Sequence, residues 1–211
     1  VFLRALLFLI ARLPISLLES LCSLAGRMVP FIIPSRFSLA AEHLRLAYPE
    51  WSEQQVQQTA KEVFTHSAMA FCESALLWEG RLQAKVQIDE AKARQLIDQY
   101  PKAVYLCAHL GNWEVLPAIV LKLFSVPDIS IIAKAPSNKL MSAYLYEART
   151  KCGIKIVYRG RRYVRSVARM LVAAERMAFV ADQSIHSNHL LEVPFFGRPA
   201  PTPETLAKLV I

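Results

Sequence analysis

Residues 104–114 read Val104-Tyr105-Leu106-Cys107-Ala108-His109-Leu110-Gly111-Asn112-Trp113-Glu114, and this segment decides the fold. It begins as a short apolar run of residues that favour β-strands, and it then reaches a histidine and a glycine. A second apolar stretch, 115–124, follows at once. This order predicts a buried strand, a tight turn and a helix. Asn112 is the expected N-cap of that helix, which would place Glu114 in its first turn.

Apolar strand patterns alternate with helical patterns throughout the second half of the chain. Alternation at this spacing predicts a largely parallel sheet flanked by helices, which is an α/β fold. The predicted strands are 104–108, 129–134, 154–158 and 178–182, and the predicted helices are 113–124, 137–152, 162–176 and one from 203. Residues 101–211 are therefore expected to form an α/β domain. This domain is expected to be incomplete at its C-terminus, because the chain ends within a helical pattern.

Residues 35–100 are expected to form a helical region. Ser52 and Gln55 have the spacing of a capping box, which predicts the start of a long helix. The expected helices are Ser38–Ala47, 52–79 and 89–99, and a link rich in helix breakers is expected at Pro30–Phe37.

Residues 1–34 are strongly apolar, but charged side chains interrupt them at intervals of seven or eight residues. At about 100° per residue, these charges and several serines fall on one side of a helix, opposite leucine, isoleucine, phenylalanine and valine. Pro14 is expected to kink or divide this helix. The pattern favours an amphipathic segment that lies at a membrane surface. Two alternatives remain, namely core helices packed on the domain and a spanning helix completed by residues before Val1.

The composition combines a net charge of +8 with 54% hydrophobic residues. A basic and apolar chain suits an anionic membrane surface or an anionic amphiphile better than nucleic acid, for which no binding motif is present. The four cysteines are widely spaced and predict free thiols. His186 and His189 lie three residues apart in a polar loop without a neighbouring cysteine, so a solvated loop is favoured over a metal site.

His109 stands where the first predicted strand ends, and ligands of open α/β sheets bind beyond the carboxyl ends of strands. An ionised Glu114 could accept a hydrogen bond from one imidazole nitrogen and fix the tautomer, leaving the other nitrogen as a general base. The alternative is a structural, hydrogen-bonded histidine. Cys107 is a conceivable nucleophile, but a buried strand cysteine is the commoner case.

Further candidate residues lie near the ends of the later strands. Arginine forks bind phosphate and carboxylate groups, and Arg149 and Arg159 flank the third predicted strand, so both are candidates for an anionic head group. Asp182 and Gln183 end the fourth strand. There Asp182 could contact substrate, support the His109 network or cap a loop. Phe195 and Phe196 could line an acyl pocket or fill the core.

The segment His109-Leu110-Gly111-Asn112-Trp113-Glu114 resembles the His-x4-Glu motif of the bacterial lipid A biosynthesis acyltransferases, the lauroyl and myristoyl transferases, which are similar to glycerolipid acyltransferases. Further similar stretches are 44–50, with His43 where the family has Asn, Arg149 to Gly153, Asp182-Gln183, and the loop Val193-Pro194-Phe195-Phe196-Gly197-Arg198-Pro199. The resemblance runs from about Leu13 to the end of the chain.

This resemblance implies an acyltransferase of the glycerolipid-acyltransferase-like fold at the cytoplasmic face of the bacterial inner membrane. It implies acyl carrier protein as the donor of a fatty acyl thioester, and a phosphorylated lipid A precursor of lipopolysaccharide biosynthesis as the acceptor. His109 and Glu114 are the expected catalytic residues, and no metal or organic cofactor is implied. The expected substrate-binding residues are Asn112, Arg149, Arg159, Asp182 and Gln183.

Three alternatives to this function stay open from the sequence. The first is transfer from acyl-CoA to another glycolipid, such as a mannoside. The second is a non-catalytic protein of the same fold that binds a membrane surface. The third, which the composition disfavours, is a nucleic-acid-binding protein.

Overall fold

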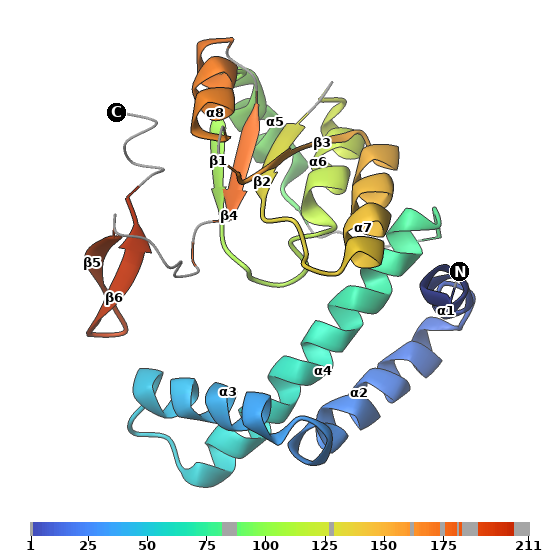
Figure 1. Ribbon diagram of the computed structural model, residues 1–211, viewed down its shortest axis with the longest axis vertical. Helices are drawn as coiled ribbons and strands as arrows, with labels where there is room; N and C mark the ends of the chain where they lie inside the picture. Colours follow the sequence, from blue (N-terminus) through green and yellow to red (C-terminus); the bar gives the residue numbers. More distant parts are fainter. Residues whose placement is uncertain are drawn as a thin grey trace. The chain divides into compact units, whose positions relative to one another are not determined.

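The structure, a computed structural model, describes residues 2–81, 88–126, 129–160, 163–173, 176–180, 182 and 190–204. The chain divides into two compact units, Val1–Leu82 and Gln83–Ile211 (Figure 1). The first unit is helical throughout its described part, and the second contains the sheet. The three-part division at 34 and 100 stays a prediction.

The described part of the first unit contains four helices, α1 (Phe2–Ile10), α2 (Ile15–Ile32), α3 (Pro34–Ala47) and α4 (Glu53–Trp78). Pro14 is the N-cap of α2 and separates it from α1, as predicted. The predicted link at Pro30–Phe37 is wrong, because α2 continues through Pro30 and α3 begins at Pro34. Pro30 stands in the last turn of α2, and Pro34 occupies the first turn of α3, where a missing N–H costs little.

Helix α4 is the element against which the other three helices pack (Figure 1). It starts with the predicted capping box, in which Ser52 accepts from the Gln55 N–H and the Gln55 side chain accepts from the Ser52 N–H. Two apolar clusters of buried residues support the packing. The first contains Ala11, Leu18, Cys22, Cys72 and Leu76, and the second contains Phe37, Ala41, Val56 and Ala60.

Between these clusters, α2 approaches α4 at Gly26, which is buried. A methyl group added at Gly26 would lie 1.9 Å from Oγ1 of Thr65 and 2.7 Å from the carbonyl oxygen of Lys61. Both distances are far inside van der Waals contact, and a backbone carbonyl of a helix cannot move aside alone. Glycine is therefore required at this position by the spacing of the two helices.

Gly26→Ala is expected to destabilise the first unit, although alanine is the better helix former. Forcing an extra methyl group into a packed contact costs about 1–3 kcal/mol in the free energy of unfolding. Urea unfolding followed by circular dichroism measures this change. The double variant Gly26→Ala/Thr65→Ala should recover part of the loss, because it removes the nearer of the two obstacles. An unfolding midpoint that stays unchanged or rises in Gly26→Ala would contradict the close contact.

The second unit contains a four-stranded sheet in which every neighbouring pair of strands is parallel, in the order β1-β4-β2-β3. The α/β expectation with a parallel sheet is thus confirmed, and the predicted strand positions agree within one or two residues. The elements are α5 (Glu90–Gln99), β1 (Val104–Cys107), α6 (Leu116–Phe124), β2 (Ile129–Ala133), α7 (Lys139–Lys151), β3 (Ile154–Tyr158), α8 (Tyr163–Val172) and β4 (Met177–Val180).

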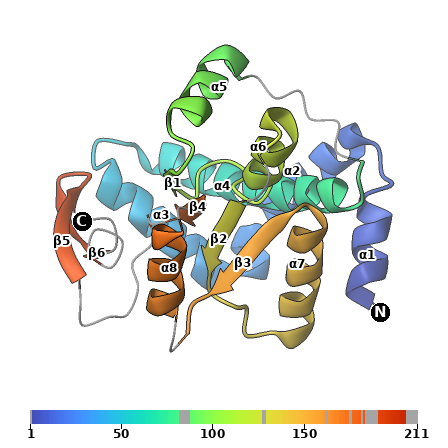
Figure 2. The ribbon, with the colours of Figure 1, turned by 90° about the horizontal axis from the view of Figure 1, so that it is seen from above.

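The order of the strands explains how the helices cover the sheet. The connections β1-α6-β2 and β2-α7-β3 run in one direction across the sheet, whereas β3-α8-β4 runs back. Because crossovers between parallel strands are right-handed, α8 is expected on the face opposite to α6 and α7. Figure 2 shows α6 and α8 on opposite sides of the strands. Strand β4, the last along the chain, is inserted between β1 and β2.

A hairpin of β5 (Leu190–Phe195) and β6 (Arg198–Pro203) follows the sheet in the chain. Phe196 and Gly197 both have positive φ angles, 49° and 70°, which is the geometry of a tight two-residue hairpin turn. Two expectations are wrong here: residues 193–199 are mostly strand rather than loop, and Pro203 ends a strand rather than starting a helix. The remainder of that predicted helix lies outside the described residues.

Candidate active site

The candidate site is built at the carboxyl edge of the parallel sheet. Cys107 at the end of β1 lies in register with Val180 at the end of β4. His109 and Asp182 each follow these positions by two residues, so neighbouring strands deliver both side chains to the same edge. In open α/β sheets this is the edge at which ligands bind.

Asp182 holds His109 through two hydrogen bonds. The backbone N–H of His109 donates to Oδ2 of Asp182 at 2.7 Å, and Nδ1 of the imidazole lies 2.6 Å from Oδ1. Since an ionised carboxylate only accepts hydrogen bonds, Nδ1 carries the proton and Nε2 is left as the basic nitrogen. The Trp113 ring meets the imidazole edge to face, with ring centres 4.8 Å apart.

The charge state of Asp182 suits this arrangement. Partial burial by itself raises the pKa of the Asp182 carboxyl, but hydrogen bonds from the His109 side chain and backbone favour the carboxylate, and the net pKa is lowered. Asp182 therefore stays ionised at any pH at which an imidazole acts as a base. Its stabilising effect is present above the ordinary range of an aspartate and is lost as pH falls through the lowered pKa.

The predicted contact between Glu114 and the imidazole is wrong, because the acid on Nδ1 is Asp182. Glu114 instead binds Arg149, whose Nε donates to Oε2 at 3.0 Å and whose Nη2 donates to Oε1. Glu114 also lies outside the first helical turn, because α6 begins at Leu116 with Val115 as its N-cap. Pro117 explains this shift, since proline is tolerated best in the first turn of a helix.

The Glu114–Arg149 pair joins the turn after β1 to the last turn of α7. Arg149 is buried, and its side chain is only 9% exposed. A fork that binds a carboxylate at two points fixes both position and orientation. The geometry therefore favours Arg149 as the residue that positions Glu114, rather than as a ligand for a substrate head group.

The remaining predicted residues are more widely distributed. The backbone carbonyl of Asn112 accepts from the Val115 N–H at 3.2 Å, which makes Asn112 part of the turn rather than the N-cap. Arg159 is exposed and follows β3, the strand at the opposite edge from β1. Gln183, like the histidine pair His186 and His189, lies outside the described residues. Sequence reasoning missed Lys134, an exposed cation that follows β2 at the same carboxyl edge.

The described residues do not form a metal centre or an activated thiol. Within the described ranges, no group of three or more metal-ligating side chains is close enough to hold an ion. Cys107 is half-buried, and burial raises the pKa of its thiol, which lowers the fraction of reactive thiolate. The described residues bring together an oriented histidine whose Nε2 has no hydrogen-bond partner among them, and such a nitrogen can take a proton from a hydroxyl group.

We expect neutral His109 to carry its proton on Nδ1. Long-range ¹H–¹⁵N correlation spectra distinguish the two tautomers. Asp182→Ala should move the His109 signals toward the Nε2–H form, because the acceptor on Nδ1 is lost. Glu114→Gln is the matched control, and it should leave the tautomer unchanged. The opposite pattern, with a change only in Glu114→Gln, would restore Glu114 as the partner of the imidazole.

The family model described as bacterial lipid A biosynthesis acyltransferase matches residues 2–211. No curated protein matches the chain. The match extends over both units and includes the His109–Asp182 and Glu114–Arg149 pairs.

Proposed function

The chain belongs to the bacterial lipid A biosynthesis acyltransferase family, and we propose that it moves a fatty acyl chain from an acyl carrier protein thioester to a hydroxyl of a phosphorylated lipid A precursor. The family expected from the His109–Glu114 motif is confirmed. The observation that carries the proposed reaction is the imidazole of His109, which Asp182 orients at the ligand-binding edge of a parallel sheet.

In the proposed mechanism, Nε2 of His109 removes the proton from the acceptor hydroxyl as its oxygen attacks the carbonyl carbon of the thioester. The imidazolium that forms carries a proton on each nitrogen, and the Asp182 carboxylate stabilises it through Nδ1. Collapse of the tetrahedral intermediate breaks the C–S bond. The departing thiolate takes the proton from Nε2, which returns His109 to its starting form. No acyl-enzyme is formed, in keeping with the raised pKa of the Cys107 thiol.

Glu114 is assigned a positioning role in this mechanism. Its carboxylate is held by the buried Arg149 guanidinium, and it ends the turn that begins at His109. Breaking a buried ion pair leaves an uncompensated charge, which is strongly destabilising. Loss of either partner is therefore expected to shift the turn and the position of Nε2, while the hydrogen bond to Asp182 keeps the proton on Nδ1.

The proposed acceptor is a lipid, and the first unit offers an apolar surface for a bilayer. Around α2, side chains fall into three sectors at about 100° per residue. The sector that includes Leu18 and Cys22 is buried, and a second carries Glu19 and Arg27. The third sector is apolar and exposed, and it consists of Leu17, Leu21, Leu24, Met28, Phe31 and Ile32.

We propose that this third sector lies against the cytoplasmic face of the bacterial inner membrane. By length and composition alone, α2 would also be able to cross a membrane, with a mean hydropathy of 1.4 over Ile15–Ile32. The charged sector favours the interfacial arrangement, because a helix that lies in the membrane surface needs one polar side exposed to water and one apolar side. The basic residues of the unit would add attraction to anionic lipids.

The membrane contact is tested with the double variant Leu24→Ser/Phe31→Ser. Both side chains are more than half exposed, so their loss should leave the helical packing intact. Removing about 3 kcal/mol of apolar burial would weaken partitioning onto vesicles of phosphatidylethanolamine and phosphatidylglycerol about a hundredfold. Sedimentation of the vesicles measures this, and Val172→Ser, at an even more exposed apolar residue of the second unit, is the control. Equal binding by all three proteins would remove α2 as the membrane contact.

The reaction is tested by mass spectrometry of the lipid product. His109→Ala should lower turnover about 10²- to 10⁴-fold while the circular dichroism spectrum is kept, because the general base is lost. Cys107→Ala should retain most activity. Wild-type turnover in His109→Ala would overturn the mechanism. Assays that pair each donor, acyl carrier protein thioester or acyl-CoA, with each acceptor, lipid A precursor or mannoside, decide the substrates.

A further inference from the structure

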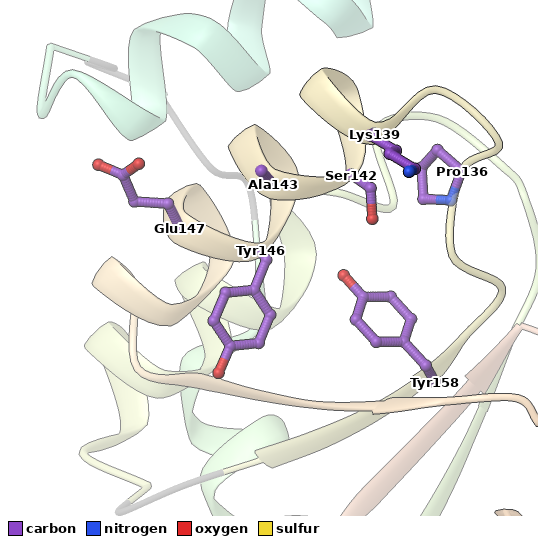
Figure 3. A pocket seen from close by; sticks show the side chains of 7 residues that line it. All are labelled: Pro136, Lys139, Ser142, Ala143, Tyr146, Glu147 and Tyr158. Carbon is purple, nitrogen blue, oxygen red and sulfur yellow. The ribbon is translucent and has the colours of Figure 1, made fainter.

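A pocket with a volume of about 520 Å³ opens between α7 and the end of β3 (Figure 3). Its lining is mixed in character, with three hydroxyl groups, two charged groups and two small apolar residues. The lining residues are Pro136, Lys139, Ser142, Ala143, Tyr146, Glu147 and Tyr158. Figure 3 shows Ser142, Tyr146 and Glu147 along one side of α7, with the Tyr158 hydroxyl directed toward Ser142.

The pocket lies at the same carboxyl edge of the sheet as His109. Tyr158 is the last residue of β3, and Lys139 is the first residue of α7. In the order β1-β4-β2-β3, strand β3 is three positions away from β1. At about 4.8 Å per strand, this corresponds to about 14 Å between the pocket edge and the strand that carries His109. A ligand in the pocket is therefore too far away to be the reacting group itself.

Two polar groups of the lining have no partner among the described residues. The Tyr158 hydroxyl is shielded from solvent and makes no hydrogen bond to any described residue. A buried hydroxyl without a partner is unfavourable, so this group favours a ligand that supplies one. Lys139 is exposed and forms no ion pair within the described part of the chain. It provides a positive charge at the rim of the pocket.

The chemistry of the lining selects the kind of ligand. Most of the lining surface is apolar, and hydroxyl groups from both α7 and β3 are set into it. An acyl chain has no use for these hydroxyl groups, whereas a sugar ring uses both kinds of surface. The faces of Tyr146 and Tyr158 suit the C–H face of a sugar ring, and the hydroxyl groups suit its oxygens. Lys139 suits an anionic substituent on that sugar. Lys134 and Arg159, which follow β2 and β3, add positive charge to the same edge.

We propose that this pocket binds a phosphorylated sugar of the acceptor, remote from the hydroxyl that is acylated. Lys139 pairs with the phosphate, and Tyr158 and Ser142 hydrogen-bond to the sugar. This inference rests on the proposed function for the identity of the acceptor, but the pocket and its chemistry are independent of the His109 mechanism.

The kinetic test uses Tyr158→Phe and Lys139→Ala. Tyr158→Phe removes one oxygen atom, and Lys139→Ala removes the charge. Each variant should raise the acceptor KM about tenfold or more, while kcat and the donor KM stay within about twofold, because the reacting groups are untouched. Lys122→Ala, at an exposed lysine of α6 outside the pocket, should leave all three parameters unchanged. An acceptor KM equal to that of the wild type in both pocket variants would overturn the inference.

A binding test separates the pocket from the reaction. Saturation-transfer difference NMR on His109→Ala, with glucosamine 1-phosphate as the probe, measures binding without turnover. The signal should weaken in His109→Ala/Tyr158→Phe and His109→Ala/Lys139→Ala. Equal signals in all three proteins would overturn the pocket, even if the enzyme transfers acyl chains. Inorganic phosphate should displace the probe only at concentrations well above those at which the probe itself binds. Displacement at equal concentrations would mean that the sugar contributes nothing to binding, and it would overturn the sugar assignment. Pocket-dependent binding without any turnover in the wild type would instead overturn the proposed function and keep the pocket.

Discussion

The two hydrogen bonds between His109 and Asp182 are the constraint on which the site depends. The residues are 73 positions apart in the sequence, and they meet only because β4 pairs in parallel with β1. One of the bonds uses the His109 backbone, so the ring and the chain that carries it are fixed together. A shift of one residue in the β1–β4 register would move Asp182 by about 3.3 Å and break both bonds. The His109 imidazole is therefore oriented as a general base only when β1 and β4 have paired in the correct register.

This dependence explains which parts of the site could be predicted. Local patterns located β1 and β4 to within a residue or two, and they placed His109 and Asp182 at strand ends. The partner of His109 was predicted wrongly because Glu114 is near in sequence, whereas the strand order that brings Asp182 closer is a long-range property. Pro117 was the available signal against Glu114, since it sets the start of α6 at Leu116. Arg149 was predicted to bind an anionic head group, whereas in the structure it binds Glu114 of the protein itself.

Proline accounts for most of the other differences between expectation and structure. Pro30 was predicted to break the helix, yet it lies in the last turn of α2. There its missing N–H removes only one backbone hydrogen bond of the helix. The strand β6 contains three prolines, and such a segment has the composition of a loop. A two-stranded hairpin tolerates them because each strand has an outer edge on which no N–H is needed. By contrast, the capping box at Ser52 and the helix division at Pro14 were predictable, since both depend on neighbours in the sequence.

The three sectors of α2 have a consequence for how this helix can vary. The same 18 residues contact protein on one side, carry charge on the second and expose apolar side chains on the third. Gly26 fixes the rotation of the helix about its own axis, because only a position without a side chain fits against Lys61 and Thr65. Insertion or deletion of one residue would turn the rest of the helix by about 100° and bring charged side chains onto the apolar side. Exchange of one apolar side chain for another in this helix is therefore tolerated far better than any change in its length.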